Sequence, residues 1–410
     1  MTYINAVKYL MSLPNDGDSF NDSSSIERMR LACDSFEISP RNLKCIHIYG
    51  NEGKESCYSM LSSILENASY KVGHYFASSS NELKNCICCD KKSISHSDFA
   101  ETITLIYRFY KAKFKEVLPH RHEIMTLASI LYFQKESCDI VILEKSESRY
   151  DPTSITDAPV LSLITPFVER QAESNIFENI IHKGTAETVS SPQHKEVYNA
   201  ISMACSISGC RLTIPIYSEM EIEKITLFKT FFKYRGIDYS VRSFSPSQTL
   251  NAITAIEAAN ALNRAGANIT EENVIKGIAG AVVDEKCETL SLSPTIILFS
   301  GEKDKTDHFL AAIAQVKDQL SSNISIYINE GTDTSIPELT SALSVRGVNP
   351  QNIQIVPDIS VHTNHAITNE LKNLFRDLKS QYEFDFTTIF IGSKNFTSRI
   401  KDCMSDFLGS

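Results

Sequence analysis

The sequence is poor in glycine and has no excess of positive charge. Only 15 of its 410 residues are glycine, although nucleotide-binding α/β proteins use glycine wherever the backbone comes close to phosphate. The formal net charge is −10, whereas a nucleic-acid-binding protein usually carries a basic balance or a basic stripe. The composition therefore argues against a nucleic-acid partner, and the scarcity of glycine argues against an unmodified nucleotide site.

The sequence also gives no sign of a segment for secretion or for crossing a membrane. Its first residues, MTYINAVKYLMSLP, are too polar and too short for either role. The 11 cysteines are scattered and odd in number, so reduced thiols in a cytosol are the simplest interpretation. The run CICC at 86–89 lacks a second pair at zinc spacing, which favours a strand end over a metal site. We expect a cytoplasmic monomer without a membrane partner.

The chain is too long for one ordinary core. It also contains many short apolar runs between helical patterns. A length of 410 residues suggests at least two domains. Seven apolar runs are continuous rather than alternating, which is typical of buried parallel strands. They cover residues 45–49, 139–144, 160–165, 295–299, 324–328, 353–356 and 387–391. Strands that alternate with helices predict an α/β fold with parallel sheets.

Helical spacing and its stop signals locate the helices and one boundary. Residues 123–136 are apolar at helical spacing, a second helical pattern ends at Gly266, and Thr270 is a predicted N-cap. Residues 286–295 have no helical period and end just after a proline, and a new run of β/α units follows. We therefore predict one domain over residues 1–290 and a second over 291–410.

The stretch IHIYGNEGKES at 46–56 has the layout of a phosphate-binding turn between a strand and a helix. Its glycines would let the backbone approach an anion, its lysine could reach terminal phosphates, and its serine could donate to Mg²⁺. These candidates are Gly50, Gly53, Lys54 and Ser56. The strict pattern G-x-x-x-x-G-K-[ST] is not met, because Ile48 stands at its start and Glu55 follows the lysine. A carboxylate roughly 4–5 Å from a phosphate costs about 1 kcal/mol in water, so a solvent-exposed turn remains the alternative.

Two histidine groups do not predict a metal site. In HRH at 120–122 the two histidines are two residues apart, which does not place them on one helix face, and we expect them to be exposed to solvent. His362 and His365 could share a helix face, but no third ligand is visible.

Several segments follow one another in the order known from one enzyme family. The turn GNEGKES is similar to G-T-N-G-K-G-S, and HEIMTLAS is similar to F-E-x-x-T-x-A. DIVILEKSESRYDPTS is similar to a strand leading to E-V-G-x-G-G-R-x-D-A-T-N, and SPSQTLNAITA to G-x-H-Q-x-x-N-A. Over nearly its whole length the chain resembles the folylpolyglutamate synthase/dihydrofolate synthase family of the Mur ligase group. The resemblance implies a P-loop-type parallel-sheet domain flanked by helices, followed by a smaller Rossmann-like α/β domain.

The resemblance also implies a reaction and a set of site residues. In the family, ATP activates a folate carboxylate as an acyl phosphate, which the amine of glutamate then attacks. By position, phosphates and Mg²⁺ would be bound by Gly50, Gly53, Lys54 and Ser56, with Glu144 as a second metal ligand. Asn251 would contact adenine, Lys286 stands where the family has a phosphate-binding arginine, and Lys183 matches the family's modified, metal-bridging lysine. Lys54, Glu144 and Lys183 are thus the catalytic candidates. From the residues alone, Glu144 could instead be a solvated strand end, and Gln248 and Asn251 could cap or flank a helix.

The chain departs from the family at several of its functional motifs. The aspartate–histidine pair after the third strand is replaced by Arg170 and Gln171. In the segment that reads D-G-A-H-N in the family, Phe299 replaces the aspartate and Glu302 the histidine. The proline and histidine of the substrate-side segment are replaced by Ser78 and Ser79. Two hypotheses follow: an ATP-dependent ligase, or a degenerate relative that keeps the fold as a binding or regulatory module. A dinucleotide-dependent enzyme ranks last, because no G-x-G-x-x-G follows a predicted strand.

Overall fold

The computed structural model divides the chain into two compact units. An N-terminal unit comprises Met1–Tyr217 and Asn251–Ala281, and a C-terminal unit comprises Ser218–Leu250 and Val282–Ser410. The structure describes residues 1–14, 24–77, 82–115, 117–146, 148, 150–156, 158–167, 174–283, 287–300, 306–321, 323–329, 341, 350–356, 376, 380, 386–393 and 396–402.

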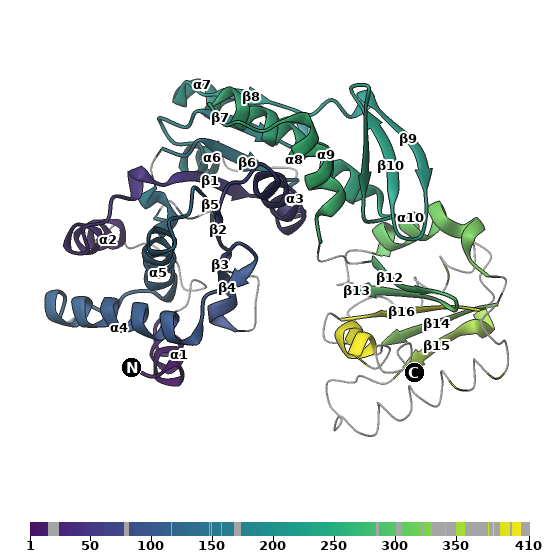
Figure 1. Ribbon diagram of the computed structural model, residues 1–410, viewed down its shortest axis with the longest axis horizontal. Helices are drawn as coiled ribbons and strands as arrows, with labels where there is room; N and C mark the ends of the chain where they lie inside the picture. Colours follow the sequence, from purple (N-terminus) through teal and green to yellow (C-terminus); the bar gives the residue numbers. More distant parts are fainter. Residues whose placement is uncertain are drawn as a thin grey trace. The chain divides into compact units, whose positions relative to one another are not determined.

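The N-terminal unit is built on one mostly parallel sheet with the strand order β4-β3-β2-β5-β1-β6-β7-β8 (Figure 1). The central strand β1 pairs in parallel with β5 and β6, and β3 runs antiparallel to both of its neighbours, β2 and β4. The strands are β1 Lys44–Tyr49, β2 Val72–Tyr75, β3 Ile87–Cys89, β4 Lys92–Ser93, β5 Ile140–Glu144, β6 Leu161–Ile164, β7 Glu187–Ser190 and β8 Arg211–Thr213. Because parallel strands end at the same edge of a sheet, the turn after β1 and the residue Glu144 come together.

Most helices of this unit pack into two apolar cores. The helices are α1 Tyr3–Met11, α2 Ser24–Ser35, α3 Lys54–Asn67, α4 His96–Lys113, α5 Arg121–Lys135, α6 Ser174–Ile180, α7 Lys195–Ser208, α8 Pro246–Arg264 and α9 Glu271–Gly280, with the short 3₁₀ segments η1 Pro40–Asn42, η2 Leu83–Cys86, η3 Pro152–Ile155 and η4 Tyr217–Glu219. Helices α1, α2, α4 and α5 share one apolar core, and α6 and α7 form a second core with Tyr49.

Helix α3 lies directly against α9, and a glycine makes this close approach possible. A Cβ on Gly277 would lie 2.5 Å from the backbone Cα of Ile64, so no larger residue fits there without moving a helix. Thr270 caps α9 with its side chain in a capping box that it forms with Asn273, as the sequence predicts. Gly266, with φ +95°, follows the end of α8 and is the predicted stop.

The C-terminal unit contains two sheets that share one apolar core. An antiparallel sheet has the order β11-β10-β9, and a mostly parallel sheet has the order β12-β13-β16-β14-β15. Leu227 and Phe244, from the antiparallel segment, pack with Phe299 and Phe309 of the second sheet and its helix. The elements are β9 Met220–Ile225, β10 Thr230–Tyr234, β11 Ile237–Val241, β12 Cys287–Leu292, β13 Thr295–Ser300, α10 Thr306–Val316, η6 Lys317–Gln319, β14 Ile324–Asn329, η7 Pro350–Asn352, β15 Ile353–Val356 and β16 Thr387–Gly392.

The α/β fold class is confirmed, and each of the seven apolar runs contains a strand. The expected burial is wrong for β15, which is the edge strand of its sheet and leaves Ile355 55% exposed. The run CICC forms the end of η2 and strand β3. The segment 286–295, for which no helix was expected, contains β12. Residues 218–250 belong to the same compact unit as the C-terminal sheet. No local sequence pattern predicts this grouping. The boundary between residues 290 and 291 stays a prediction.

Candidate functional site

The turn between β1 and α3 depends on two glycines. Gly50 has φ +140°, and a Cβ there would lie 2.3 Å from Oγ1 of Thr165, at the end of β6. Gly53 has φ +75° and is the N-cap of α3, and a Cβ there would lie 2.6 Å from Oδ1 of Asn251. Both positions therefore need glycine, for their backbone angle as well as for space. The turn is thus held tightly between the β6 end and the side chain of Asn251.

The backbone amides of this turn fall into two groups. Those of Asn51 and Glu52 donate to the carbonyl of Pro166, at 3.1 and 3.2 Å. The amides of the first turn of α3 have no carbonyl acceptor within the helix, because an α-helix leaves its first N–H groups without one. Gly53 has no side chain that could cap them. The start of α3, rather than the whole turn, is therefore the part that fits an anion.

Lys54 and Glu144 form an ion pair at the start of α3. The Nζ atom of Lys54 lies 2.8 Å from Oε1 of Glu144, and their side chains are 23% and 8% exposed. Ser56 is buried in the same first turn of α3. The pairing of β1 with β5 thus brings the predicted strand end, Glu144, to Lys54.

The two acidic residues of the turn do not pair with Lys54. The side chain of Glu55 is exposed and that of Glu52 is half-buried, and the ion pair of Lys54 is made with Glu144 instead. Solvent screens an exposed carboxylate, and Glu55 lies in the first helical turn, where the helix dipole favours negative charge. Glu55 would therefore weaken anion binding without filling the site.

The oxygen donors at this place suit a hard cation only in part. Glu144 and Ser56 supply a carboxylate and a hydroxyl, which are the ligand types that Mg²⁺ prefers. Among the described residues there is no group of three or more His, Cys, Asp or Glu side chains that could hold a metal ion. Mg²⁺ usually binds through one or two carboxylates together with phosphates and water, so the residues fit that mode and not a cage made by protein alone.

The remaining sequence-predicted site residues have different surroundings. Asn251 is buried beside Gly53, and Gln248 is buried near the start of α8, where its N–H donates to the carbonyl of Ser245. Lys183 is exposed in the segment after α6. Lys286, Arg170, Gln171, Glu302, Ser78, Ser79, His362 and His365 lie outside the described residues.

Phe299 stands where the folylpolyglutamate synthase family has an aspartate. It lies on β13, is 4% exposed and belongs to the apolar core of the C-terminal unit. Its ring centroid is 4.6 Å from that of Phe309. This position therefore contributes to packing and supplies no polar contact to a ligand.

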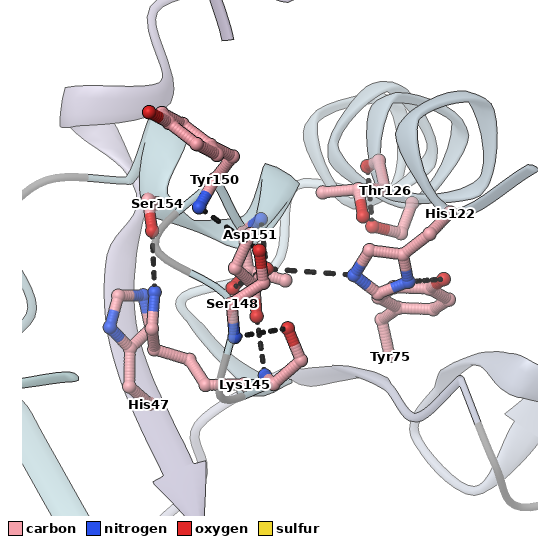
Figure 2. Close-up of polar contacts among 12 residues, drawn as sticks. His47, Tyr75, His122, Thr126, Lys145, Ser148, Tyr150, Asp151 and Ser154 are labelled. Atoms are coloured by element: carbon pink, nitrogen blue, oxygen red, sulfur yellow. Dashed lines mark hydrogen bonds and ion pairs between the residues drawn. The ribbon is translucent and has the colours of Figure 1, made fainter. Parts of the chain in front are cut away.

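A second polar group, which the sequence did not predict, lies on the other face of β5 (Figure 2). We call it the Lys145 cluster; it consists of His47, His122, Lys145, Asp151, Ser154 and His182. Successive residues of a strand point to opposite faces, and the N–H of Lys145 continues the pairing by donating to Ile48. The Nζ atom of Lys145 lies 2.6 Å from Oγ of Ser154 and 3.3 Å from Nε2 of His182.

Asp151 is the acceptor that organises this cluster. Its Oδ1 accepts hydrogen bonds from the backbone N–H and the hydroxyl of Thr153, both at 2.7 Å, and its Oδ2 accepts one from the N–H of Ser146. Nε2 of His122 lies 3.5 Å from Oδ1. Burial alone would raise the pKa of Asp151, but the charge of Lys145 and the contact with His122 hold it well below its usual range. Asp151 is therefore a buried carboxylate that stays ionised.

Burial also shifts the basic members of the cluster. It lowers the pKa of Lys145, against the attraction of Asp151. It lowers the pKa of His47 well below its usual value, and the charges of Lys145 and His182 add to this effect. His47 is therefore neutral, and its Nε2 lies 2.8 Å from Oγ1 of Thr156. Together these contacts fix the segment that follows Glu144.

The expected solvent exposure of the histidines in 120–122 is wrong for His122. Its side chain is 6% exposed, and Nδ1 lies 3.1 Å from the hydroxyl of Tyr75. The expectation assumed that α5 has a solvent-facing side at this point. Helix α5 is instead buried on most of its surface, so a histidine on either face of its first turn meets other side chains.

The comparisons with known proteins confirm the resemblance. No family model matches the chain. A Caenorhabditis elegans protein named as a folylpolyglutamate synthase is 26% identical over 145 residues, which cover 34% of this chain and 28% of that protein. The dihydrofolate synthase/folylpolyglutamate synthase of Bacillus subtilis is 25% identical over 289 residues, which cover 65% of this chain and 66% of that protein. The matched segments thus span less than two thirds of either relative.

Solved structures extend the similarity in fold to the whole chain. The folylpolyglutamate synthetase of Lactobacillus casei has a TM-score of 0.77 at 17% identity and covers 98% of this chain and 100% of its own. The Mycobacterium tuberculosis folylpolyglutamate synthase complexed with ADP has a TM-score of 0.73 at 16% identity and covers 98% of each chain. A complex of such a synthase with AMPPCP and folate has a TM-score of 0.73 at 16% identity and covers 98% of this chain and 99% of its own. None of the described helices combines the length and the hydrophobicity that a membrane span requires.

Proposed function

We propose that this chain, a divergent relative of the folylpolyglutamate synthases, is an ATP-dependent ligase. In this proposal it joins glutamate to a folate-like carboxylate through an acyl phosphate. The observation that supports it best is the Lys54–Glu144 ion pair, 2.8 Å long, at the start of α3 behind two required glycines. The fold neighbours that were solved with ADP or with AMPPCP and folate support the choice of ligands.

Different groups of the chain would bind the phosphates, the cation and the rest of the nucleotide. The first-turn amides of α3 would bind phosphate oxygens. Lys54 would exchange the carboxylate of Glu144 for a phosphate, which leaves Glu144 and Ser56 to hold a cation. Asn251, fixed beside Gly53, would contact the nucleotide. When bound, MgATP supplies the phosphoryl group and the charge neutralisation that phosphoryl transfer needs.

The test is release of ADP by the purified protein with folate, glutamate and MgATP. We expect turnover by the wild type and a loss of roughly 10²-fold for Glu144→Gln, which keeps the shape and removes the charge. Lys276→Ala is the control, because that lysine is exposed on α9 and pairs with the exposed Glu272. No ADP from the wild type with any folate would refute the ligase.

A second candidate function is a binding or regulatory module without turnover. The observation that favours it is Phe299, which occupies the apolar core where the family has a polar residue. Under this alternative the site at the start of α3 binds a nucleotide and releases no product. The same assay, combined with a binding measurement, separates the two functions.

A further inference from the structure

Two cysteines outside the candidate nucleotide site lie in direct contact. Cys89 is the last residue of β3 and Cys138 lies in the turn between α5 and β5. Their Sγ atoms are 3.4 Å apart, although the residues are 49 positions apart in the chain. We propose that these two thiols are a modification site, where they form an intramolecular disulfide when hydrogen peroxide reaches them.

The backbone on both sides of the pair is fixed by the sheet. Cys89 lies opposite Gly73 of β2 in the antiparallel register. The N–H of the residue after Cys89 donates to the carbonyl of Val72 at 3.0 Å, and the N–H of the residue after Cys138 donates to the carbonyl of Lys71 at 2.8 Å. The backbone next to each cysteine is thus hydrogen-bonded to one of two consecutive residues, Lys71 and Val72, at the start of β2. A disulfide is about 2.05 Å long, so the sulfurs must approach by only about 1.4 Å.

The surroundings of the pair favour its oxidation chemically. The contact with Cys138 lowers the pKa of the Cys89 thiol, and the charge of Lys71 acts in the same direction, whereas burial and the charges of Asp90 and Glu136 act against it. The ammonium of Lys71 is held 3.0 Å from Oε2 of Glu136, and its side chain is 34% exposed. Cys138 is half-buried. Cys89 itself is 5% exposed, so a small oxidant reaches its sulfur from the side of Cys138. The thiolate is the reactive form of a cysteine.

The reaction balances with peroxide as the oxidant. The Cys89 thiolate attacks one oxygen of H₂O₂; a sulfur–oxygen bond forms, the oxygen–oxygen bond breaks, and the hydroxide that leaves takes up the thiol's proton as water. The sulfur of Cys138 then attacks the resulting sulfenic acid. The sulfur–sulfur bond forms, the sulfur–oxygen bond breaks, and the hydroxide leaves as a second water with the proton of Cys138. Two thiols lose two electrons and one peroxide gains them.

Peptide mapping of the full chain tests the proposal without any variant. After peroxide treatment, alkylation and trypsin, the fragments 85–91 and 136–145 should be found joined. Their joined mass should be about 2 Da below the sum of the two fragments, and dithiothreitol should separate them. Fragmentation should place the bond on Cys89. Both fragments recovered alkylated, or a bond on another cysteine of 85–91, would overturn the proposal.

Variants separate this pair from its neighbours. Cys138→Ser should abolish the joined fragments and leave a sulfenic acid on Cys89 that dimedone traps. Cys88→Ser is the matched control, because Cys88 is buried beside Cys89 but its Sγ faces the carbonyl of Asn85 at 3.4 Å. This control should keep the joined fragments at the wild-type yield. Absence of a dimedone adduct on Cys89 in Cys138→Ser, or loss of the joined fragments in Cys88→Ser, would contradict the assignment.

Discussion

The buried charges of Lys145 and Asp151 should make the stability effects of their substitutions depend on each other. Lys145→Met removes an ammonium whose side chain is 2% exposed, and it leaves the fully buried carboxylate of Asp151 without its main opposite charge. The charge of Lys145 stabilises the ionised form of Asp151, and its Nζ also donates a hydrogen bond to Ser154. A hydrogen bond to a charged group contributes about 1.5–3 kcal/mol, so we expect Lys145→Met to lower the free energy of unfolding by about that amount.

Asp151→Asn should cost a comparable amount, because an amide nitrogen would meet the N–H of Ser146 where Oδ2 now accepts. The double variant has no charge left without a partner. It should be less destabilised than the sum of the two single variants by about 2 kcal/mol.

Urea denaturation followed by far-UV circular dichroism measures this cycle. Most of the described helices lie in the N-terminal unit, so the helical signal reports on it. Lys276→Ala, an exposed change on α9, should alter stability by less than about 0.5 kcal/mol. If the two single effects add within about 0.5 kcal/mol, Lys145 and Asp151 do not stabilise each other, and the reasoning about the cluster is wrong.

Two further predictions concern other parts of the N-terminal unit. Burial lowers the pKa of His74 to about 4, so the folded state binds fewer protons than the unfolded state between about pH 4 and 6.5. Through this histidine the protein should therefore be about 2 kcal/mol less stable at pH 5 than at pH 8. Denaturation curves recorded at the two pH values should show a smaller difference in stability for His74→Gln than for the wild type; an equal difference would refute this. Gly277→Ala should separate α3 from α9, because its Cβ would lie 2.5 Å from the Cα of Ile64; we expect a loss of about 3 kcal/mol in thermal unfolding, and an unchanged Tm would contradict the close packing.

The parallel strands and the turn after β1 could be predicted because their signals are local. A continuous apolar run ending in glycines specifies a buried strand and a tight turn wherever the rest of the chain lies. The pairing of β1 with β5 then brings Lys54 to Glu144, as expected from strands that end at one edge. The fold and this part of the candidate site follow from patterns of a few residues each.

The Lys145 cluster could not be predicted from local patterns. A lysine after a strand end is usually solvated, and the burial of Lys145 depends on contacts with Ser154 and His182, which come from later segments. The contact between Cys89 and Cys138 also joins distant segments through the register of β2. Such pairs leave no periodic signal in one sequence.

The proposed function requires that the start of α3 bind the phosphates of a nucleotide through Lys54. Isothermal titration calorimetry with MgATP on the wild type and on Lys54→Ala tests it most directly. We expect saturable binding by the wild type, with a gain in stability of roughly 2.7 kcal/mol at a hundredfold excess over Kd, and at least a tenfold weaker Kd for Lys54→Ala. Equal affinity of the two proteins, or no heat of binding with the wild type, would contradict the account.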